Sequence, residues 1–258
     1  LDIGATGMLA QQLHVDVISN NIANMTTTGY KRQRAEFQDL IYQNKIRPGS
    51  QSSDIGTIVP SGIQLGLGVK AGSLYRIHEQ GTMEQTSNVL DMAIAGKGYF
   101  QIELPSGETA YTRAGDFQRN AEGVIVTAQG YPVQPAITIP DDAVDIQINN
   151  SGEVFVKIDG QINLSNLGQI QLARFANPTG LEAIGDNLFL ETPASGNAAV
   201  GNPMDDGFGK LEQGLRESSN VNIVQEITNL ITAQRAYEMN SKVVQTSDEM
   251  MSTVSQMR

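Results

Sequence analysis

Apolar residues recur every seven positions along the C-terminal part of the chain, from Ser219 to Met257. One row of this spacing consists of Ile223, Leu230, Tyr237, Val244 and Met251. A second row runs beside it and consists of Ala236, Val243, Met250 and Met257. Two neighbouring rows are typical of a long amphipathic helix with a wide apolar face. No Pro or Gly interrupts the segment, and Asn220 or Asn222 is suited to cap its start.

The N-terminal segment shows a similar spacing and predicts a second helix over residues 1–28. Its first row consists of Leu1, Met8, Val15, Ile18, Ile22 and Met25. A second row on another side consists of Leu9, Leu13 and Val17. We expect this helix to end in the three threonines before Gly29, because Thr is a poor helix former and Gly is a common C-terminal stop.

Two apolar rows on one helix need two partners, and a helix at the other terminus supplies only one. The neighbouring partner is therefore expected to be another copy of the same chain. Helices rich in Asn, Ser and Thr are marginal in water by themselves. We accordingly expect the two termini to be weakly ordered in a monomer and to become helical against neighbouring copies.

The middle of the chain has a different pattern. Residues 35–45 suggest a short helix with Phe37, Leu40 and Ile41 on one side, and residues 47–68 are rich in Pro, Gly and Ser, as in a loop. Short apolar alternations separated by turn residues then predict antiparallel strands, with Asp159-Gly160 as a tight hairpin signal.

The predicted fold is therefore α+β, with long paired N- and C-terminal helices, an extended segment and a central antiparallel β body. The expected divisions are an N-terminal helix at 1–30, an extended connector at 31–70, the β-rich body at 71–214 and a C-terminal helix at 215–258.

Charge narrows the choice of partners. The 258 residues include 17 basic and 28 acidic side chains, a formal net charge of −11. This charge disfavours nucleic acid and anionic membrane surfaces as partners. No stretch of 18 apolar residues is present, and the opening LDIGATGM lacks the basic-then-apolar order of a secretory signal.

A catalytic set is not apparent. The chain has two histidines, His14 and His78, no Cys, and no nucleophile-elbow motif. Adjacent carboxylates in a strand point to opposite faces, and the acidic pairs at 141–142 and 205–206 lie in turn-like contexts. We therefore predict no catalytic residue, no metal site and no cofactor. The basic cluster of Lys31, Arg32 and Arg34 predicts either a solvated turn or docking to an acidic face of another copy.

Both terminal segments carry recognisable motifs. The segment SNNIANMTTTGYKRQ at 19–33 and the segment SNVNIVQEITNLITAQRAYEMNSKVVQTSDEM at 219–250 resemble those of the bacterial flagellar axial proteins, the rod and hook subunits. The matching positions of the first motif are Asn21, Ile22, Ala23, Asn24, Thr28, Gly29 and Tyr30. Segments 91–117, 123–135 and 180–192 are similar to the β module of the same family, so the resemblance covers essentially the whole chain.

Two internal segments resemble the distal-rod type within this family, namely 42–69 and 133–140. The distal-rod stretch itself lies at about 46–63. It contains Arg47, Pro48, Gly49, Ser50, Pro60, Ser61 and Gly62. In the family, this stretch distinguishes the rigid distal rod from the curved hook, and the resemblance implies that it packs against neighbouring subunits.

The resemblance implies a structural subunit of a helical tube in the bacterial flagellar basal body, which spans the periplasm toward the outer membrane. The terminal helices would form an inner coiled-coil layer around an export channel, and the tube would transmit torque from motor to hook. Implied partners are further copies of the chain, proximal rod proteins, the hook protein, the P-ring and L-ring proteins, and the flagellar type III export apparatus. Gln234, Arg235 and Asn240 are expected to bond across copies.

Two alternatives remain at this point. A proximal rod or hook subunit has the same terminal motifs. A secreted cell-wall hydrolase is a less favoured alternative, since the residues supply no plausible catalytic set.

Overall fold

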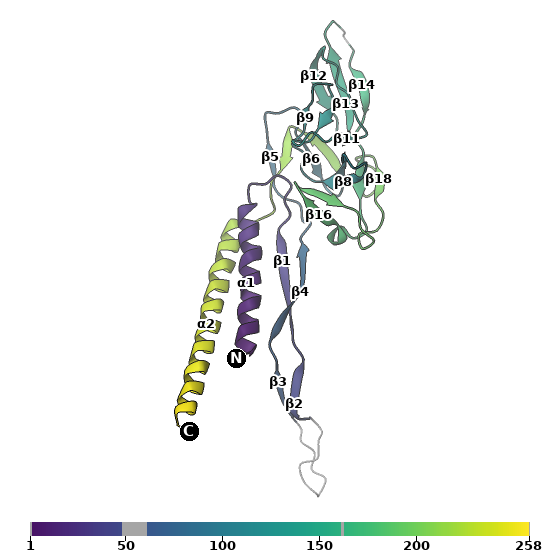
Figure 1. The fold of residues 1–258 in the computed structure, drawn as a ribbon. Coiled ribbons are helices and arrows are strands. Elements are labelled where there is room, and N and C mark those ends of the chain that lie inside the picture. The colour runs from purple at the N-terminus through teal and green to yellow at the C-terminus, as the bar shows by residue number, and fades with distance from the viewer. Residues whose placement is uncertain (1, 48–60, 161–162, 258) are drawn as a thin grey trace. The chain divides into compact units, whose positions relative to one another are not determined.

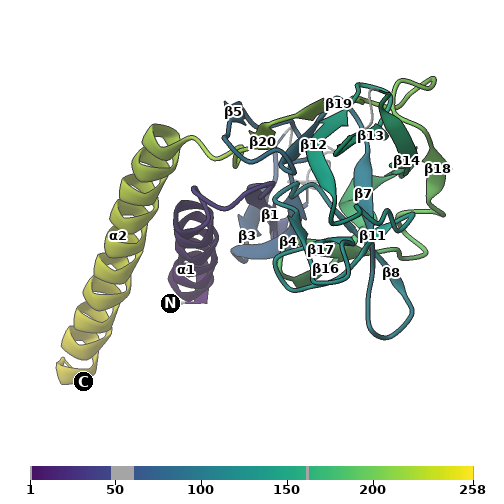
Figure 2. The ribbon, with the colours of Figure 1, turned by 90° about the horizontal axis from the view of Figure 1, so that it is seen from above.

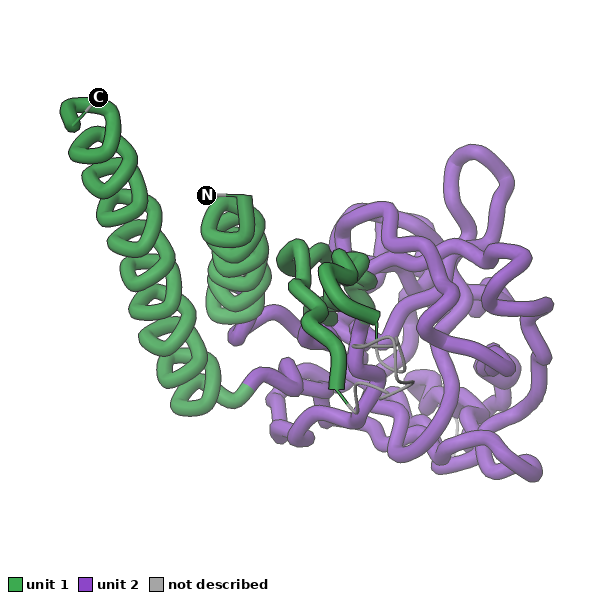
Figure 3. The backbone as a smooth tube through the Cα atoms, turned by 90° about the horizontal axis from the view of Figure 1, so that it is seen from below, with its two compact units in different colours: residues 1–23, 33–75, 222–258 green, residues 24–32, 76–221 purple. Residues whose placement is uncertain are grey.

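The computed structural model describes residues 2–47, 61–160 and 163–257 (Figure 1). The chain forms two compact units (Figure 3). Unit 1 comprises residues 1–23, 33–75 and 222–258, and unit 2 comprises residues 24–32 and 76–221. Pro48, Gly49, Ser50 and Pro60 of the predicted distal-rod stretch lie outside the described residues, as does Leu1 of the N-terminal row.

Unit 1 contains the two long helices, α1 (Asp2–Ala23) and α2 (Ile223–Gln256), which lie side by side in Figures 1 and 2. The side chain of Asn222 caps α2 by accepting a hydrogen bond from the backbone N–H of Gln225 at 3.2 Å. Neither of the described helices α1 and α2 contains an 18-residue window that is apolar enough to cross a membrane.

The first helix ends earlier than predicted. It stops at Ala23 instead of continuing to residue 28, because the chain turns at once: the backbone N–H and the hydroxyl of Thr27 both bond back to Asn24, at 3.2 and 3.1 Å. Asn and Thr side chains favour such local bonds over a further helical turn.

The rest of unit 1 is a pair of two-stranded ribbons. Strand β1 (Gln33–Asp39) pairs with β4 (Val69–Arg76), and β2 (Tyr42–Ile46) pairs antiparallel with β3 (Ile63–Gly66). The predicted short helix at 35–45 is therefore wrong. Burial alternates from Gln33 to Phe37, so this segment has the period of two of a strand. Phe37 packs its ring edge-on against His14 of α1, with centroids 5.9 Å apart.

Unit 2 is the β body. Its largest sheet has the order β16-β17-β8-β7-β15-β18, and β11 also pairs with β7. The strands of this sheet are β7 (Tyr99–Glu103), β8 (Thr109–Thr112), β11 (Val133–Gln134), β15 (Leu172–Arg174), β16 (Glu182–Gly185), β17 (Leu188–Leu190) and β18 (Ala199–Gly201). A 3-10 turn, Pro178–Gly180, precedes β16.

A second sheet consists of β12 (Ala143–Ile148), β13 (Glu153–Ile158) and β14 (Ser165–Gln169). Three further pairs join β5 (Met83–Gln85) to β20 (Leu215–Glu217), β6 (Met92–Ala95) to β19 (Lys210–Gln213), and β9 (Gln118–Arg119) to β10 (Ile125–Val126). The pairings of unit 2 are antiparallel, as predicted. The Asp159-Gly160 signal does not give a tight hairpin, because the connection between β13 and β14 spans residues 159–164.

Two apolar clusters fill unit 2. The larger one includes Met92, Phe100, Ile102 and Leu172, which have no exposed surface. The smaller one is mainly aromatic, and Tyr99, Tyr111, Phe175 and Phe189 meet edge to face within it. Edge-to-face contacts between rings add stabilisation beyond the area they bury.

His78 borders the aromatic cluster and bonds to the Tyr99 hydroxyl at 2.9 Å through Nδ1. Burial, and then the positive charges of Lys31, Arg76 and Arg113, lower the pKa of His78 to about 4. Burial raises the pKa of Tyr99 to about 12. At neutral pH the phenol is therefore protonated and donates to a neutral imidazole.

We predict that Gly29→Ala destabilises unit 2 more than Gly107→Ala does. Both glycines have positive φ, 67° and 84°, but a Cβ on Gly29 would lie 2.7 Å from the backbone N of Ala114, whereas a Cβ on Gly107 meets nothing within 4 Å. Urea unfolding is expected to give losses of about 2–4 kcal/mol and about 1 kcal/mol, respectively. Equal losses would mean that Gly29 is needed only for its backbone conformation.

The neutral state of His78 predicts a pH dependence of stability. Because the folded pKa is depressed below the unfolded value of 6.5, the unfolded chain takes up the proton first as pH falls. The associated stability is complete above pH 6.5 and is lost toward pH 4, by up to about 3 kcal/mol. Urea unfolding of His78→Gln should lack this part of the pH slope, and His14→Gln should keep it. An imidazole of His78 that titrates near 6.5 by NMR would contradict the prediction.

Candidate assembly surface

The two helices of unit 1 run antiparallel along small residues of α1. A Cβ on Gly4 would lie 2.9 Å from Cγ2 of Val244, and a Cβ on Gly7 would lie 2.9 Å from Nδ2 of Asn240. Farther along, Nδ2 of Asn21 is 3.3 Å from Oε2 of Glu226. The partners on α2 move backward as those on α1 move forward. The two glycines let the backbone of α1 approach α2 closely.

Asn21 joins three elements of unit 1 through one side-chain amide. Its Oδ1 accepts from the backbone N–H of Gln33 at 2.8 Å, and its Nδ2 donates to the backbone C=O of Gln33 at 2.9 Å. The same Nδ2 reaches Glu226 on α2. Asn21 and Glu226 are buried, at 2% and 5% exposure. The amide therefore acts as a strand-like partner for β1 and fixes both helices to it.

The α2 face that contacts α1 is centred beside the predicted heptad row, which reaches α1 through Val244. Glu226 and Ala233 are the buried residues of α2, and they lie seven positions apart, as do Ala233 and Asn240. The predicted row lies beside this face: Leu230 and Val244 are half-buried, whereas Ile223, Tyr237 and Met251 are exposed at 43%, 42% and 63%.

A large apolar surface of α2 is left open within one chain. Exposed residues of α2 include Val224, Ile227, Ile231, Met239, Val243, Met250 and Val254, and Met257 directly after the helix is exposed as well. Of the polar residues predicted to bond across copies, Gln234 and Arg235 are exposed, whereas Asn240 lies against Gly7 of α1.

The N-terminal row likewise contains both buried and exposed residues. Ile18 is buried, Met8, Val15 and Ile22 are half-buried, and Met25 is exposed at 38%. In the second row, Val17 is buried and Leu9 is 67% exposed. The α1 helix therefore also keeps apolar side chains on a face that α2 does not cover.

The later residues of the N-terminal motif lie in unit 2. The backbone N–H of Gly29 donates to the carbonyl of Glu217 at 2.8 Å, and the carbonyl of Thr28 accepts from the side chain of Asn187 at 3.2 Å. The carbonyl of Tyr30 accepts from the backbone N–H of Asn220 at 3.4 Å. These bonds join the chain entering unit 2 to the chain leaving it.

A buried ion cluster lies at the same place. Nζ of Lys31 is 2.5 Å from Oε1 of Glu217, and Nε of Arg113 is 3.0 Å from Oε2 of the same carboxylate. The three side chains are at most 5% exposed. Burial lowers the pKa of Lys31, and the charge of Glu217 opposes that shift. Two basic side chains therefore share the one carboxylate of Glu217.

The predicted basic cluster at 31–34 is thus neither a solvated turn nor a docking patch as a whole. Lys31 is buried in its ion pair, and Arg32 pairs with Glu79 at 3.4 Å. The backbone N–H of Arg32 donates to the side chain of Asn220 at 2.8 Å, and Asn220 also bonds to the carbonyls of Ile77 and Glu79. Arg34 is exposed on β1.

The described residues of the distal-rod stretch lie at one end of the β2–β3 ribbon. Ile46 is paired with Ile63 at its end, beyond which Arg47 and Ser61 are exposed and Gly62 is half-buried. Both strands carry exposed apolar side chains. These are Tyr42, Ile46, Ile63 and Leu65, and Ile41 precedes them at 81% exposure. A two-stranded ribbon of this kind has little stability of its own in water.

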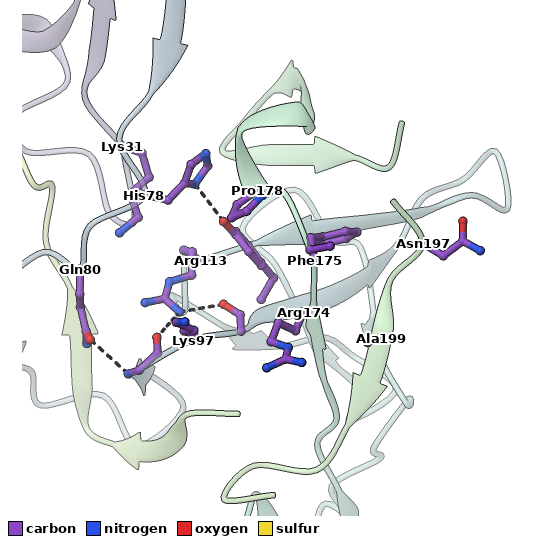
Figure 4. A pocket seen from close by; sticks show the side chains of 14 residues that line it. Lys31, His78, Gln80, Lys97, Arg113, Arg174, Phe175, Pro178, Asn197 and Ala199 are labelled. Carbon is purple, nitrogen blue, oxygen red and sulfur yellow. Dashed lines mark hydrogen bonds between the residues drawn. The ribbon is translucent and has the colours of Figure 1, made fainter. Parts of the chain in front are cut away.

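Unit 2 also contains a cavity of about 650 Å³ (Figure 4). Lys31, Arg113 and Tyr99 line it, and Lys97 and Arg174 add two exposed cations. Nη1 of Arg113 donates to the carbonyls of Gly96 and Gly98 at 2.9 and 2.7 Å, which holds the loop that carries Lys97. Among the described residues, no three His, Asp or Glu side chains are grouped so as to hold a metal ion.

Three family models match the chain in separate segments. The model described as "Flagella basal body rod protein" matches residues 1–31, and the "Flagellar hook protein FlgE/F/G D1 domain" matches residues 93–156. The "Flagellar basal body rod FlgEFG protein C-terminal" model matches residues 212–257.

Curated relatives are similar over nearly the full length. The flagellar basal-body rod protein FlgG of Caulobacter vibrioides is 64% identical over 100% of this chain and 98% of its own length. The protein of the same name from Agrobacterium fabrum is 53% identical over 99% of this chain and 97% of its own length. The one from Bacillus subtilis is 40% identical over 96% of this chain and 94% of its own length. The chain therefore belongs to the FlgG family of flagellar basal-body rod proteins.

Proposed function

We propose that this chain is the subunit of the distal rod and assembles with further copies into a rigid helical tube. The observation that carries the proposal is the apolar surface of unit 1. Exposed rows on α1 and α2 stay open after the two helices have packed on each other, and contiguous exposed apolar surface of this kind marks a site of association. Heterologous contacts between identical chains generate a helical filament when they do not close into a ring.

Family membership makes the chain a structural subunit of the flagellar rod and not an enzyme, so the cell-wall hydrolase alternative is dropped. Within that role, we propose an inner coiled-coil domain formed by residues 1–30 and 215–258, a connector at 31–70 and an outer β body at 71–214. The row Ile223, Leu230, Tyr237, Val244 and Met251 would then contact helices of neighbouring copies.

The remaining proposals follow from a tube of this kind. Its wall would transmit torque from motor to hook, and its lumen would pass exported subunits across the periplasm. Proximal rod proteins and the hook protein would adjoin its two ends, the P-ring and L-ring proteins would surround it, and the flagellar export apparatus would deliver the subunit. The termini would order fully on assembly, because the open rows of a single chain expose apolar surface to water.

The distal assignment, as opposed to the proximal rod or the hook, depends on the stretch at about 46–63. The β2–β3 ribbon presents apolar side chains on both strands toward solvent, and its exposed Tyr42, Ile46 and Ile63 need a partner surface. A ribbon clamped between neighbouring subunits would oppose bending of the tube.

We predict that Met251→Asp blocks assembly and leaves the single chain folded. Met251 is 63% exposed, so the charge costs little in the monomer, within about 0.5 kcal/mol, but would be buried without a partner in the tube. The matched variant Ser252→Asp adds the same charge one residue away from the row. Circular dichroism measures the fold, and swimming and electron microscopy of basal bodies measure assembly. Normal rods with Met251→Asp would remove the proposed contact row.

Replacing residues 47–62 by Asn-Gly tests the distal assignment. Ile46 and Ile63 are already paired, so a two-residue turn can join them and keep the β2–β3 ribbon. Tubes of this variant should be curved or more flexible in negative-stain images. As a control, the turn at 105–108 between β7 and β8 is replaced in the same way. Tubes as straight and stiff as the unmodified ones would contradict the distal assignment.

A further inference from the structure

The cavity of unit 2 is a cationic site on an acidic body. Unit 2 contains ten basic and nineteen acidic residues, so most of the net negative charge of the chain belongs to it. The described residues that line the cavity nevertheless include four cations, Lys31, Lys97, Arg113 and Arg174, and neither Asp nor Glu. The distribution of charge therefore reverses locally at this cavity.

Two basic side chains that line the cavity share one acidic partner among the described residues. Lys31 and Arg113 are almost fully buried and share the single carboxylate of Glu217. Burying a charge without a counterion is costly. The lowered pKa of His78, which Lys31 and Arg113 help to depress, is consistent with a positive potential in the cavity. An anion that enters would gain from this potential.

Lys97 and Arg174 supply the exposed cations of such a site. Lys97 stands between Gly96 and Gly98, both at positive φ, and Arg113 and Gln80 hold this loop from two sides (Figure 4). Arg174 lies at the end of β15, with its guanidinium over the ring of Phe208 at 5.8 Å. Nη1 of Arg174 donates a long hydrogen bond of 3.5 Å to the carbonyl of Gly207. Both cations are exposed and within reach of an incoming group.

We propose that this cavity receives a carboxylate side chain from a neighbouring copy of the chain in the assembled rod. This inference rests on the proposed polymer of identical subunits. The occupant is argued from charge complementarity, because unit 2 of each copy exposes carboxylates at its turns, among them Asp141, Asp142 and Asp206. Asp141 is 89% exposed, and its ion pair with Arg119 is 3.8 Å long. Pairing one of these carboxylates with Lys97 and Arg174 would fix neighbouring bodies in register.

The direct test is zero-length carbodiimide cross-linking of the assembled rod, which joins a lysine Nζ to a carboxylate only when the two are in contact. Unlabelled and ¹⁵N-labelled chains are mixed before assembly, and cross-linked peptides are identified by mass spectrometry. We expect a cross-link from Lys97 to an Asp or Glu of a differently labelled copy. A Lys97 that stays unlinked, or that links only within its own copy, would overturn the proposal.

Charge reversal gives the second readout. Lys97→Glu with Arg174→Glu should raise the protein concentration needed for polymerisation by at least about tenfold. Both side chains are exposed, so the fold should survive, which circular dichroism checks. Lys97→Arg keeps the charge and should polymerise normally, and Lys157→Glu reverses an exposed charge on β13, outside the cavity, and should have a smaller effect.

These outcomes separate the inference from the function on which it rests. If the unmodified chain polymerises and the double variant does so equally well, the cavity has no role in assembly while the rod proposal stands. If the unmodified chain forms no polymer under any condition tested, the proposed function fails and the inference fails with it.

Discussion

Unit 2 depends on the ion pairs and the hydrogen bond that the buried carboxylate of Glu217 makes. This carboxylate binds Lys31 at the point where the chain enters the unit, Arg113 after β8, and the backbone N–H of Gly81 at 3.0 Å. The carbonyl of the same residue accepts from Gly29. A buried pair adds little net stability compared with an apolar core, but loss of one partner strands a charge. The cluster therefore specifies how the entering and leaving segments meet more than it stabilises them.

Unit 1 uses a polar side chain in a similar way. The amide of Asn21 satisfies both backbone groups of Gln33 and also reaches Glu226 on α2. An apolar residue at this position would leave those backbone groups without partners, at the cost of an unsatisfied buried hydrogen bond. The N-terminal motif thus has a structural reason at several positions: Asn21 joins unit 1, and Gly29 lets the chain approach Arg113 and Ala114 in unit 2.

The sequence predicted the type of the long elements better than their contacts. A seven-residue spacing identifies a helix because it depends only on the helical period, and both helices are present. It does not say which face meets which partner. The α2 face that packs on α1 contains Glu226 and Ala233. It therefore includes a charged residue, Glu226, which a pattern of apolar and polar positions would place in solvent. The sequence pattern predicts a helix where strand β1 lies, because the alternation of Ala35 and Phe37 is too short to exclude a helical turn.

The ion cluster could not have been predicted at all, because Lys31 and Glu217 are 186 residues apart and nothing local marks them as partners.

The exposed apolar rows and the net charge of the chain act in opposite directions on association. Exposed apolar rows on two helices would promote random association in a neutral protein. A net charge of −11, concentrated on unit 2, makes undirected encounters between bodies repulsive. In the proposed polymer, association would be favoured in an orientation that covers the apolar rows and brings an acidic side chain of one body to the cationic cavity of the next. Specific contact geometry, and not total apolar area, therefore decides which aggregate forms.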